Sequence, residues 1–245
     1  MTDSHPWVSN IGDISEVHYT LDSTITMALT LPLPNQNTVN LALPSFTLDV
    51  NQIPVKPPVQ RSRNLDGLGG LEWNYFERHK VELCVTPETQ AEITRGVDVR
   101  SLGLVAYQRY LKSELYKRRP PEATLQLSNT EANELWSDMR TLLWPTVKNN
   151  SLMPRQIADV NQVFYHAVSS GSTADNSVFV TQDGNFLERA VPFYERYGVT
   201  VLSPNAAWER YQQKYNLEVP TTGQLDNLWS RQQQLFSSIR GSSGW

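Results

Sequence analysis

Cysteine is nearly absent from this chain of 245 residues, and no long apolar run occurs in it. The single cysteine, Cys84, has no second cysteine with which to form an internal disulfide, and we expect it to be a small buried side chain in a strand. No stretch is apolar enough to cross a bilayer, and the N-terminus lacks the basic region and apolar core of a signal peptide. We therefore expect a cytoplasmic protein with no membrane partner.

Histidine and positive charge are also scarce. The four histidines and one cysteine match no zinc-site spacing, and the net charge is −4. This charge is not that of a protein that coats nucleic acid, because such binding depends on many Lys and Arg contacts to phosphates. It leaves a nuclease open, since clustered acids hold divalent cations and the cations then meet the phosphate.

The first strong pattern is an alternation of apolar and polar residues over residues 15–31, which is typical of a half-buried strand or hairpin. The apolar residues of one parity are Val17, Tyr19, Leu21, Ile25, Met27, Leu29 and Leu31. A turn at residues 35–37 and a second alternation over residues 39–43 follow. We predict a small antiparallel β-hairpin extension over residues 1–44 that covers an edge of the core; a dimerisation arm is the alternative.

Strand-like and helix-like segments alternate through the rest of the chain, after a loop at residues 54–70. Thr86-Pro87, Pro154 and Ser203-Pro204 are typical helix starts. We expect strands at residues 46–49, 81–86, 178–181 and 199–202. We expect helices at residues 71–80, from 87, 101–117, 129–144, from 154, 186–197 and 205–239, the last with a break near Pro220. This order predicts an α/β fold with a parallel sheet and helices on both faces.

Four acidic residues stand beside these elements: Asp49, Glu92, Asp159 and Asp183. Asp49 and Asp183 directly follow predicted strands, whereas Glu92 and Asp159 lie near predicted helix starts. Ligands of open α/β sheets bind beyond the carboxyl ends of the strands, where Asp49 and Asp183 are expected. Converging carboxylates raise one another's pKa, and divalent cations with a preference for oxygen ligands relieve the repulsion.

Four segments around these acids resemble, in order, the motifs of PIN-domain nucleases: residues 46–51, 86–93, 157–163 and 178–187. The resemblance covers residues 45–210. It implies a three-layer α/β/α sandwich with a mainly parallel sheet and a helical insertion around residues 100–150. Residues 211–245 would then form a C-terminal helical extension and tail.

The resemblance also implies an activity, that of a metal-dependent endoribonuclease that uses Mg²⁺ or Mn²⁺. Asp49, Glu92, Asp159 and Asp183 would be its metal-binding and catalytic residues. The residues that position those carboxylates would be Asn51, Thr181 and Asn185. RNA is the expected substrate and DNA the alternative, while a toxin-like role with an antitoxin, another protein partner and a homo-oligomer stay open.

Ordinary structural roles compete with these assignments. An Asp after a strand often starts a turn, and an acid near a helix start often faces solvent. The second hypothesis is therefore an inactive PIN-like binding or scaffold module in a protein complex. His166 shares the helical face of Asp159 and is either structural or close to the site. A phosphate-binding rim is a further expectation for the basic residues Arg61, Arg63, Lys80, Lys117, Arg118, Arg119, Lys148 and Arg155.

Overall fold

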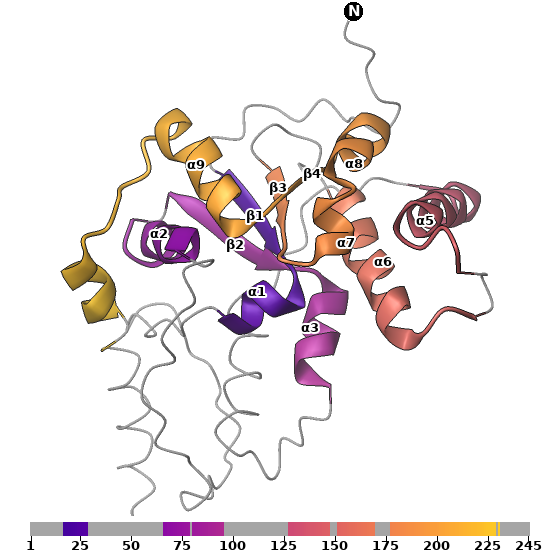
Figure 1. The fold of residues 1–245 in the computed structure, drawn as a ribbon, viewed down its shortest axis with the longest axis horizontal. Helices are drawn as coiled ribbons and strands as arrows, with labels where there is room; N and C mark the ends of the chain where they lie inside the picture. Colours follow the sequence, from indigo (N-terminus) through magenta and orange to yellow (C-terminus); the bar gives the residue numbers. More distant parts are fainter. Residues whose placement is uncertain are drawn as a thin grey trace, which may run out of the picture.

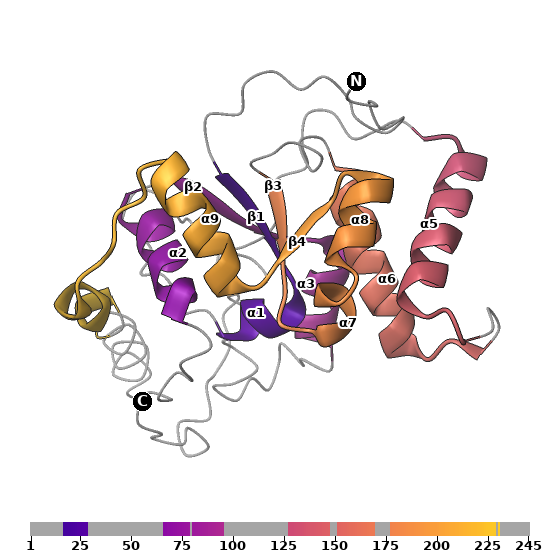
Figure 2. The same cartoon turned by 45° about the horizontal axis from the view of Figure 1, so that its top comes forward.

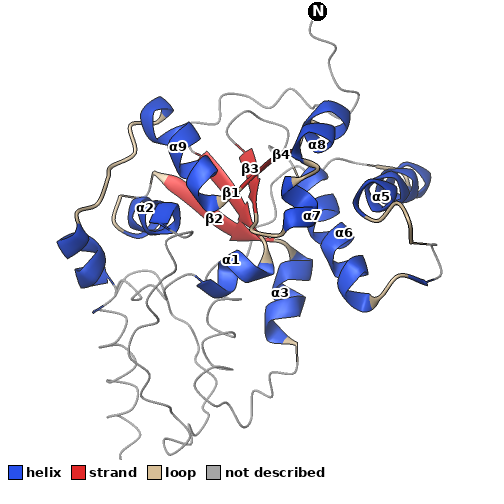
Figure 3. Ribbon diagram, in the orientation of Figure 1, coloured by secondary structure: helices blue, strands red, loops and turns tan. Residues whose placement is uncertain are grey.

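A computed structural model describes residues 17–28, 66–78, 80–95, 127–147, 151–169, 177–228 and 230. In this part of the chain, four strands form one sheet in the order β2-β1-β3-β4. All neighbouring strands are parallel (Figure 3). The strands are β1 (Val17–Leu21), β2 (Val81–Val85), β3 (Ser177–Val180) and β4 (Thr200–Leu202). The predicted α/β class with a parallel sheet is thus confirmed.

Helices surround this sheet (Figure 1). They are α1 (Ser23–Ala28), α2 (Asp66–Phe76), α3 (Pro87–Thr94), α5 (Asn129–Leu143), α6 (Pro154–Ala167), α7 (Gly184–Leu187), α8 (Ala190–Tyr197) and α9 (Pro204–Lys214). A further helical segment covers residues 222–228. None of the helices in the described ranges combines the length and the apolar character needed to cross a membrane.

The alternation of side chains along the strands separates two hydrophobic clusters. Tyr19 and Leu21 of β1 pack in one cluster with residues of α2 and α9. Phe179 of β3 packs in the other, with residues of α5, α6 and α8. Successive residues of a strand point to opposite faces, so both faces of the sheet are covered by helices (Figure 2).

The predicted helix starts are confirmed by their capping contacts. The Thr86 hydroxyl accepts the Thr89 backbone N–H at 3.1 Å, and Pro87 occupies the first turn of α3. The Ser203 hydroxyl caps α9 in the same way, through the N–H of Ala206 at 3.3 Å. These contacts satisfy backbone donors that have no partner within the helix. They fix where each helix leaves the carboxyl end of the preceding strand.

The expected antiparallel extension is wrong for the described N-terminal residues. Residues 17–21 form a strand, but it is an inner strand of the parallel sheet, between β2 and β3. Residues 23–28, also predicted as strand, form α1. An alternating pattern gives the face of a strand and not its partners, so the pairing could not be predicted from it. The rest of residues 1–44 lies outside the described ranges.

Other boundaries also differ from the prediction. Residues 66–70 were expected in a loop, but they form the first part of α2. The helix expected at residues 186–197 is divided into α7 and α8. The predicted strand at residues 46–49, the helix at residues 101–117 and the tail after residue 230 are not among the described residues.

The strand order creates a switch point between β1 and β3. From β1 the chain passes to β2 on one side, and later to β3 on the other. Helices that follow neighbouring strands in opposite directions leave a crevice at the carboxyl ends of those strands. A ligand site is therefore expected just beyond Leu21 and Val180.

Candidate functional site

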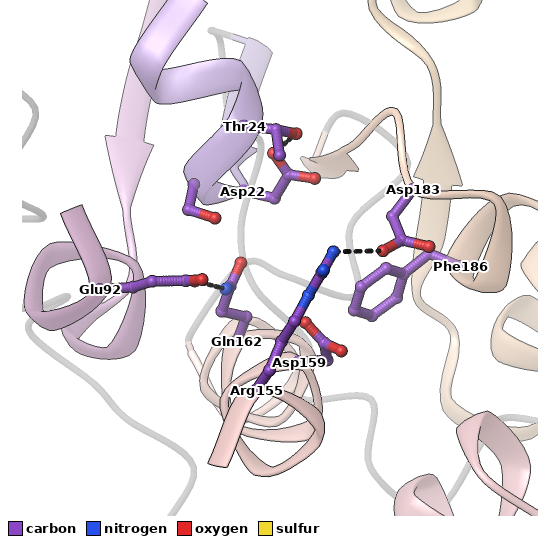
Figure 4. A pocket seen from close by; sticks show the side chains of 9 residues that line it. Asp22, Thr24, Glu92, Arg155, Asp159, Gln162, Asp183 and Phe186 are labelled. Carbon is purple, nitrogen blue, oxygen red and sulfur yellow. Dashed lines mark hydrogen bonds and ion pairs between the residues drawn. The ribbon is translucent and has the colours of Figure 1, made fainter. Parts of the chain in front are cut away.

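A pocket of ≈ 220 Å³ lies at this switch point (Figure 4). Its walls come from the segment after β1, from α3, from α6 and from the segment after β3. The lining residues are Asp22, Ser23, Thr24, Glu92, Arg155, Asp159, Gln162, Asp183 and Phe186. Among the described residues, four carboxylates from four separate segments therefore meet in one pocket with Arg155.

Asp22 follows β1 directly, and hydrogen bonds fix its carboxylate. Its Oδ1 accepts from the Thr24 hydroxyl and from the Ile25 backbone N–H, each at 2.8 Å. Its Oδ2 accepts from the Thr181 hydroxyl. Burial raises the pKa of Asp22, and these hydrogen bonds act in the opposite direction. Together these donors use most of the lone-pair positions of the Asp22 carboxylate.

Thr181 connects the two acids at the ends of the inner strands. While its hydroxyl donates to Asp22, the same oxygen accepts the backbone N–H of Asp183 at 3.0 Å. Thr181 is fully buried, and its own N–H donates to Leu202 of β4 at 3.0 Å. One side chain thus ties the segment after β3 to the segment after β1.

Asp183 caps α7 and faces Arg155, the one cationic side chain among the described residues that line the pocket. Its Oδ1 accepts the backbone N–H of Asn185 at 2.8 Å. Its Oδ2 lies 3.9 Å from a guanidinium nitrogen of Arg155. The Arg155 side chain is 76% exposed, so this ion pair is weak and solvent-screened. Arg155 is a guanidinium at the mouth of the pocket rather than a buried counter-ion.

Asp159 lies on α6 and, like Asp22, is an acid of the pocket whose pKa is raised. Burial and then the charge of Asp183 raise its pKa to about 7, while Arg155 lowers it and the charges of Glu92 and Asp22 raise it further. The residue is 8% exposed, and no described residue donates a hydrogen bond to its carboxylate. A carboxylate in this setting favours a bound proton or a bound cation.

Glu92 is held at the pocket by the neighbouring helix. The side-chain amide of Gln162 on α6 donates to Glu92 Oε2 at 2.7 Å. One turn earlier on α3, Glu88 Oε2 accepts from the amide of Asn161 at 3.0 Å. Two amides of α6 therefore hold two carboxylates of α3, and the contact fixes how far Glu92 reaches into the pocket.

Three of the predicted acids, Glu92, Asp159 and Asp183, line the same pocket. Asp49 and Asn51 lie outside the described residues. Asp22 was not predicted as a site residue, although it directly follows an apolar strand just as Asp183 does. The antiparallel reading of residues 15–31 placed Asp22 inside a hairpin and hid it.

The remaining candidates lie in different surroundings. Thr181 contacts two of the acids, whereas Asn185 reaches Asp183 through its backbone N–H. His166 is fully buried, and its Nδ1 lies 2.8 Å from the hydroxyl of Thr20 on β1. It is not among the residues that line the pocket. Lys80 donates to the Asn216 carbonyl at 3.1 Å, near the opposite end of β2. The other basic candidates apart from Arg155 fall in the undescribed segments: Arg61, Arg63, Lys117, Arg118, Arg119 and Lys148.

The donor set suits a hard divalent cation that keeps part of its water shell. All four acids offer oxygen, the ligand that Mg²⁺ and Mn²⁺ prefer. Asp159 has accepting capacity that no donor within the described residues uses. Among the described residues, no group of three or more His, Cys, Asp or Glu side chains is arranged to hold a metal ion. Mg²⁺ commonly binds through one or two carboxylates and several waters, a mode of binding that does not need three protein ligands.

Comparison of the chain with protein-family models, with curated proteins and with solved structures found no match.

Proposed function

We propose that this chain is a PIN-like, metal-dependent ribonuclease, with its site in the pocket at the ends of β1 and β3. The observation that carries the proposal is the convergence of Asp22, Glu92, Asp159 and Asp183 at the switch point of a parallel sheet. Chance surface acids rarely gather where burial raises the pKa of two of them. The proposed fold is the α/β/α sandwich that the motif resemblance implies.

Each acid has a role that follows from its position. Asp22 and Asp183 are fixed by Thr181, so they are suited to hold a cation in a set place. Asp159 offers a carboxylate with no competing donor among the described residues, and we assign it to hold a water molecule of the same hydrated cation. Glu92, held by Gln162, is placed to orient a water molecule.

Mg²⁺ or Mn²⁺ in this pocket would neutralise charge on a phosphodiester and make a water molecule a better nucleophile. The chain itself supplies the orientation of the carboxylates, and the buried ring of Phe186 gives the pocket one apolar wall. Arg155 stands at the mouth with an exposed guanidinium, a group that pairs well with phosphate. We assign it to contact the backbone of the nucleic acid strand.

The test is cleavage of labelled single-stranded RNA and DNA with Mn²⁺, with Mg²⁺ and with EDTA. Wild type is compared with Asp22→Asn, Asp49→Asn and Asp183→Asn, and the exposed Asp226→Asn is the control. We expect metal-dependent cleavage of RNA and losses of about 100-fold or more for Asp22→Asn and Asp183→Asn, the upper end for groups that support a metal site. Asp226→Asn should cleave like wild type.

The Asp49→Asn variant distinguishes whether Asp22 or Asp49 is the acid that acts with Glu92, Asp159 and Asp183. Loss of cleavage in Asp22→Asn but not in Asp49→Asn assigns that role to Asp22. Metal-dependent cleavage that survives Asp22→Asn and Asp183→Asn would exclude the pocket as the active site. If neither RNA nor DNA is cut with any metal, the alternative of an inactive binding or scaffold module replaces the nuclease.

A further inference from the structure

Gln162 is a buried polar side chain of the pocket, and only one end of its amide group has a hydrogen-bond partner among the described residues. It lies in the middle of α6, is 2% exposed and lines the pocket beside Asp159 and Glu92. Its amide nitrogen donates to Glu92 Oε2 at 2.7 Å. Its amide oxygen Oε1 is buried and accepts no hydrogen bond from any described residue.

The orientation of this amide follows from its partner. A carboxylate only accepts hydrogen bonds, so the NH₂ group of Gln162 must face Glu92 and the oxygen must face away from it. Figure 4 shows this arrangement, with the amide oxygen turned away from Glu92. Buried carbonyl oxygens of this kind are normally hydrogen-bonded or coordinated, and an exception needs a reason.

The neighbouring residue Asn161 shows what a satisfied amide looks like in the same helix. Its NH₂ group donates to Glu88 at 3.0 Å, and its oxygen accepts from the Trp136 indole at 2.8 Å. The NH₂ group of Gln162 likewise donates to a carboxylate, but its amide oxygen accepts no hydrogen bond from a described residue. The missing partner lies on the pocket side, because the donor side of the amide is already taken by Glu92.

The charges around the pocket restrict what the missing partner is. Asp22, Asp159 and Asp183 offer acceptors, so another acceptor or an anion would be repelled by them. A divalent cation or a water molecule that it orients supplies positive charge or donors, and an amide oxygen is a suitable hard ligand.

We infer that Gln162 Oε1 is a neutral oxygen ligand of the cation site, directly or through one water, while the amide nitrogen of the same side chain holds Glu92. This inference rests on the cation site of the proposed function and adds a residue to it. Gln162 is thus a positioning residue for Glu92 and a contact of the cation at once. No motif of the sequence marked it for this role.

Calorimetric binding of Mn²⁺ alone to the full chain tests the inference without any substrate. We expect Gln162→Met, which keeps the volume and removes both polar groups, to weaken Mn²⁺ binding by about 10-fold, as for groups around a metal site. Gln156→Met is the matched control. Gln156 lies on the same helix, is 9% exposed and bonds the Met153 N–H outside the pocket, so Mn²⁺ affinity should stay at the wild-type value.

The Gln162→Met substitution in a Glu92→Leu background distinguishes the effect of the Gln162 amide oxygen from that of its amide nitrogen. In Glu92→Leu protein the Gln162 amide nitrogen has lost its partner, so Gln162→Met then reports the oxygen alone. We expect several-fold weaker Mn²⁺ binding in the double variant than in Glu92→Leu. Equal affinities would show that Gln162 acts only through Glu92 and would overturn the inference.

Nuclear magnetic resonance of the wild-type chain gives a readout that does not depend on how a variant folds. Titration with Mg²⁺ should move the side-chain amide and carbonyl resonances of Gln162 and leave those of Gln156 in place. Unmoved Gln162 resonances in a protein saturated with Mg²⁺ would reject the inference. Absence of Mn²⁺ and Mg²⁺ binding by the wild type would instead overturn both the inference and the cation site on which the proposed function depends.

Discussion

Asp159 is an acid of the pocket whose pKa is raised by burial and by the charges of neighbouring acids. Its carboxylate is nearly buried, close to three other acids, and helped only by the exposed Arg155. Charge on Asp159 is thus unfavourable in the folded chain unless a cation is present. The same feature that suits Asp159 to a cation makes it a source of instability at neutral pH without one.

This imbalance predicts a pH dependence of stability in EDTA. Between the ordinary pKa of 3.8 and the folded value of about 7, the folded chain keeps a proton that the unfolded chain has released. The free energy of unfolding therefore falls as pH rises through this window and levels off above it. We expect the thermal midpoint of Asp159→Asn to exceed that of wild type by a margin that grows from pH 5 to pH 7.

Thermal unfolding followed by circular dichroism at each pH measures this margin. Asp226→Asn, which changes an exposed acid, should follow the wild-type curve. A constant difference between Asp159→Asn and wild type across the pH range would show that Asp159 does not carry the raised pKa. Saturation with Mn²⁺ should shrink the margin, because a cation stabilises the ionised carboxylate.

At the scale of elements, the close contact of α2 with α9 supports the side of the sheet opposite α6. The backbone N–H of Gly67 donates to the Asn205 side chain at 2.7 Å. A Cβ at residue 67 would lie 2.7 Å from the Pro204 carbonyl oxygen and 2.8 Å from Asn205 Cα. These are backbone atoms of α9, so the helices approach this closely only with glycine at residue 67.

Gly67→Ala should therefore lower the free energy of unfolding by about 1–3 kcal/mol, the usual cost of overpacking. Gly69→Ala is the matched control, because its Cβ would meet only the Leu225 side chain, at 3.3 Å. Alanine also favours the helix by up to about 1 kcal/mol over glycine, so the control should be neutral or stabilising. Urea unfolding measures both; equal losses would show that α2 and α9 are not in this contact.

At the scale of the whole molecule, the pocket joins segments that are far apart in sequence. Asp22, Glu92, Asp159 and Asp183 belong to different parts of the chain, and only the folded sheet brings them together. A cation bound by all these segments binds the folded chain better than the unfolded one. Ligand binding of this kind raises the free energy of unfolding by mass action.

Mn²⁺ at a concentration of 100 times its Kd should stabilise the fold by about 2.7 kcal/mol. For a chain of this size that corresponds to a rise of roughly 5–10 °C in Tm. Differential scanning calorimetry at constant ionic strength measures it, with K⁺ as the control for general screening. An Asp22→Asn, Asp183→Asn double variant should lose most of the rise, and a rise that persists in this variant would place the cation elsewhere.

Local sequence determined much of this molecule. Apolar runs gave three of the four strands within about a residue, and Thr86, Pro154 and Ser203 marked helix starts, because capping and periodicity are local effects. The order of strand and helix was enough for a parallel sheet. It also placed Glu92, Asp159 and Asp183 beside the right elements.

Tertiary structure alone decided the pairing of β1 and, with it, the place of Asp22. Inner parallel strands usually read as continuous apolar runs, and alternation is typical of strands with one face in solvent. β1 alternates because its Thr20 is polar yet buried, with its hydroxyl 2.8 Å from His166 Nδ1, and only the fold shows this. The helix start at Asp66 was likewise decided by packing, since the glycines that suggested a loop are what lets α2 approach α9. The hydrogen bond from the Gln162 amide nitrogen to Glu92 forms only because α3 packs against α6, since the two residues are 70 positions apart in the sequence. That contact also leaves the amide oxygen of Gln162 without a donor among the described residues.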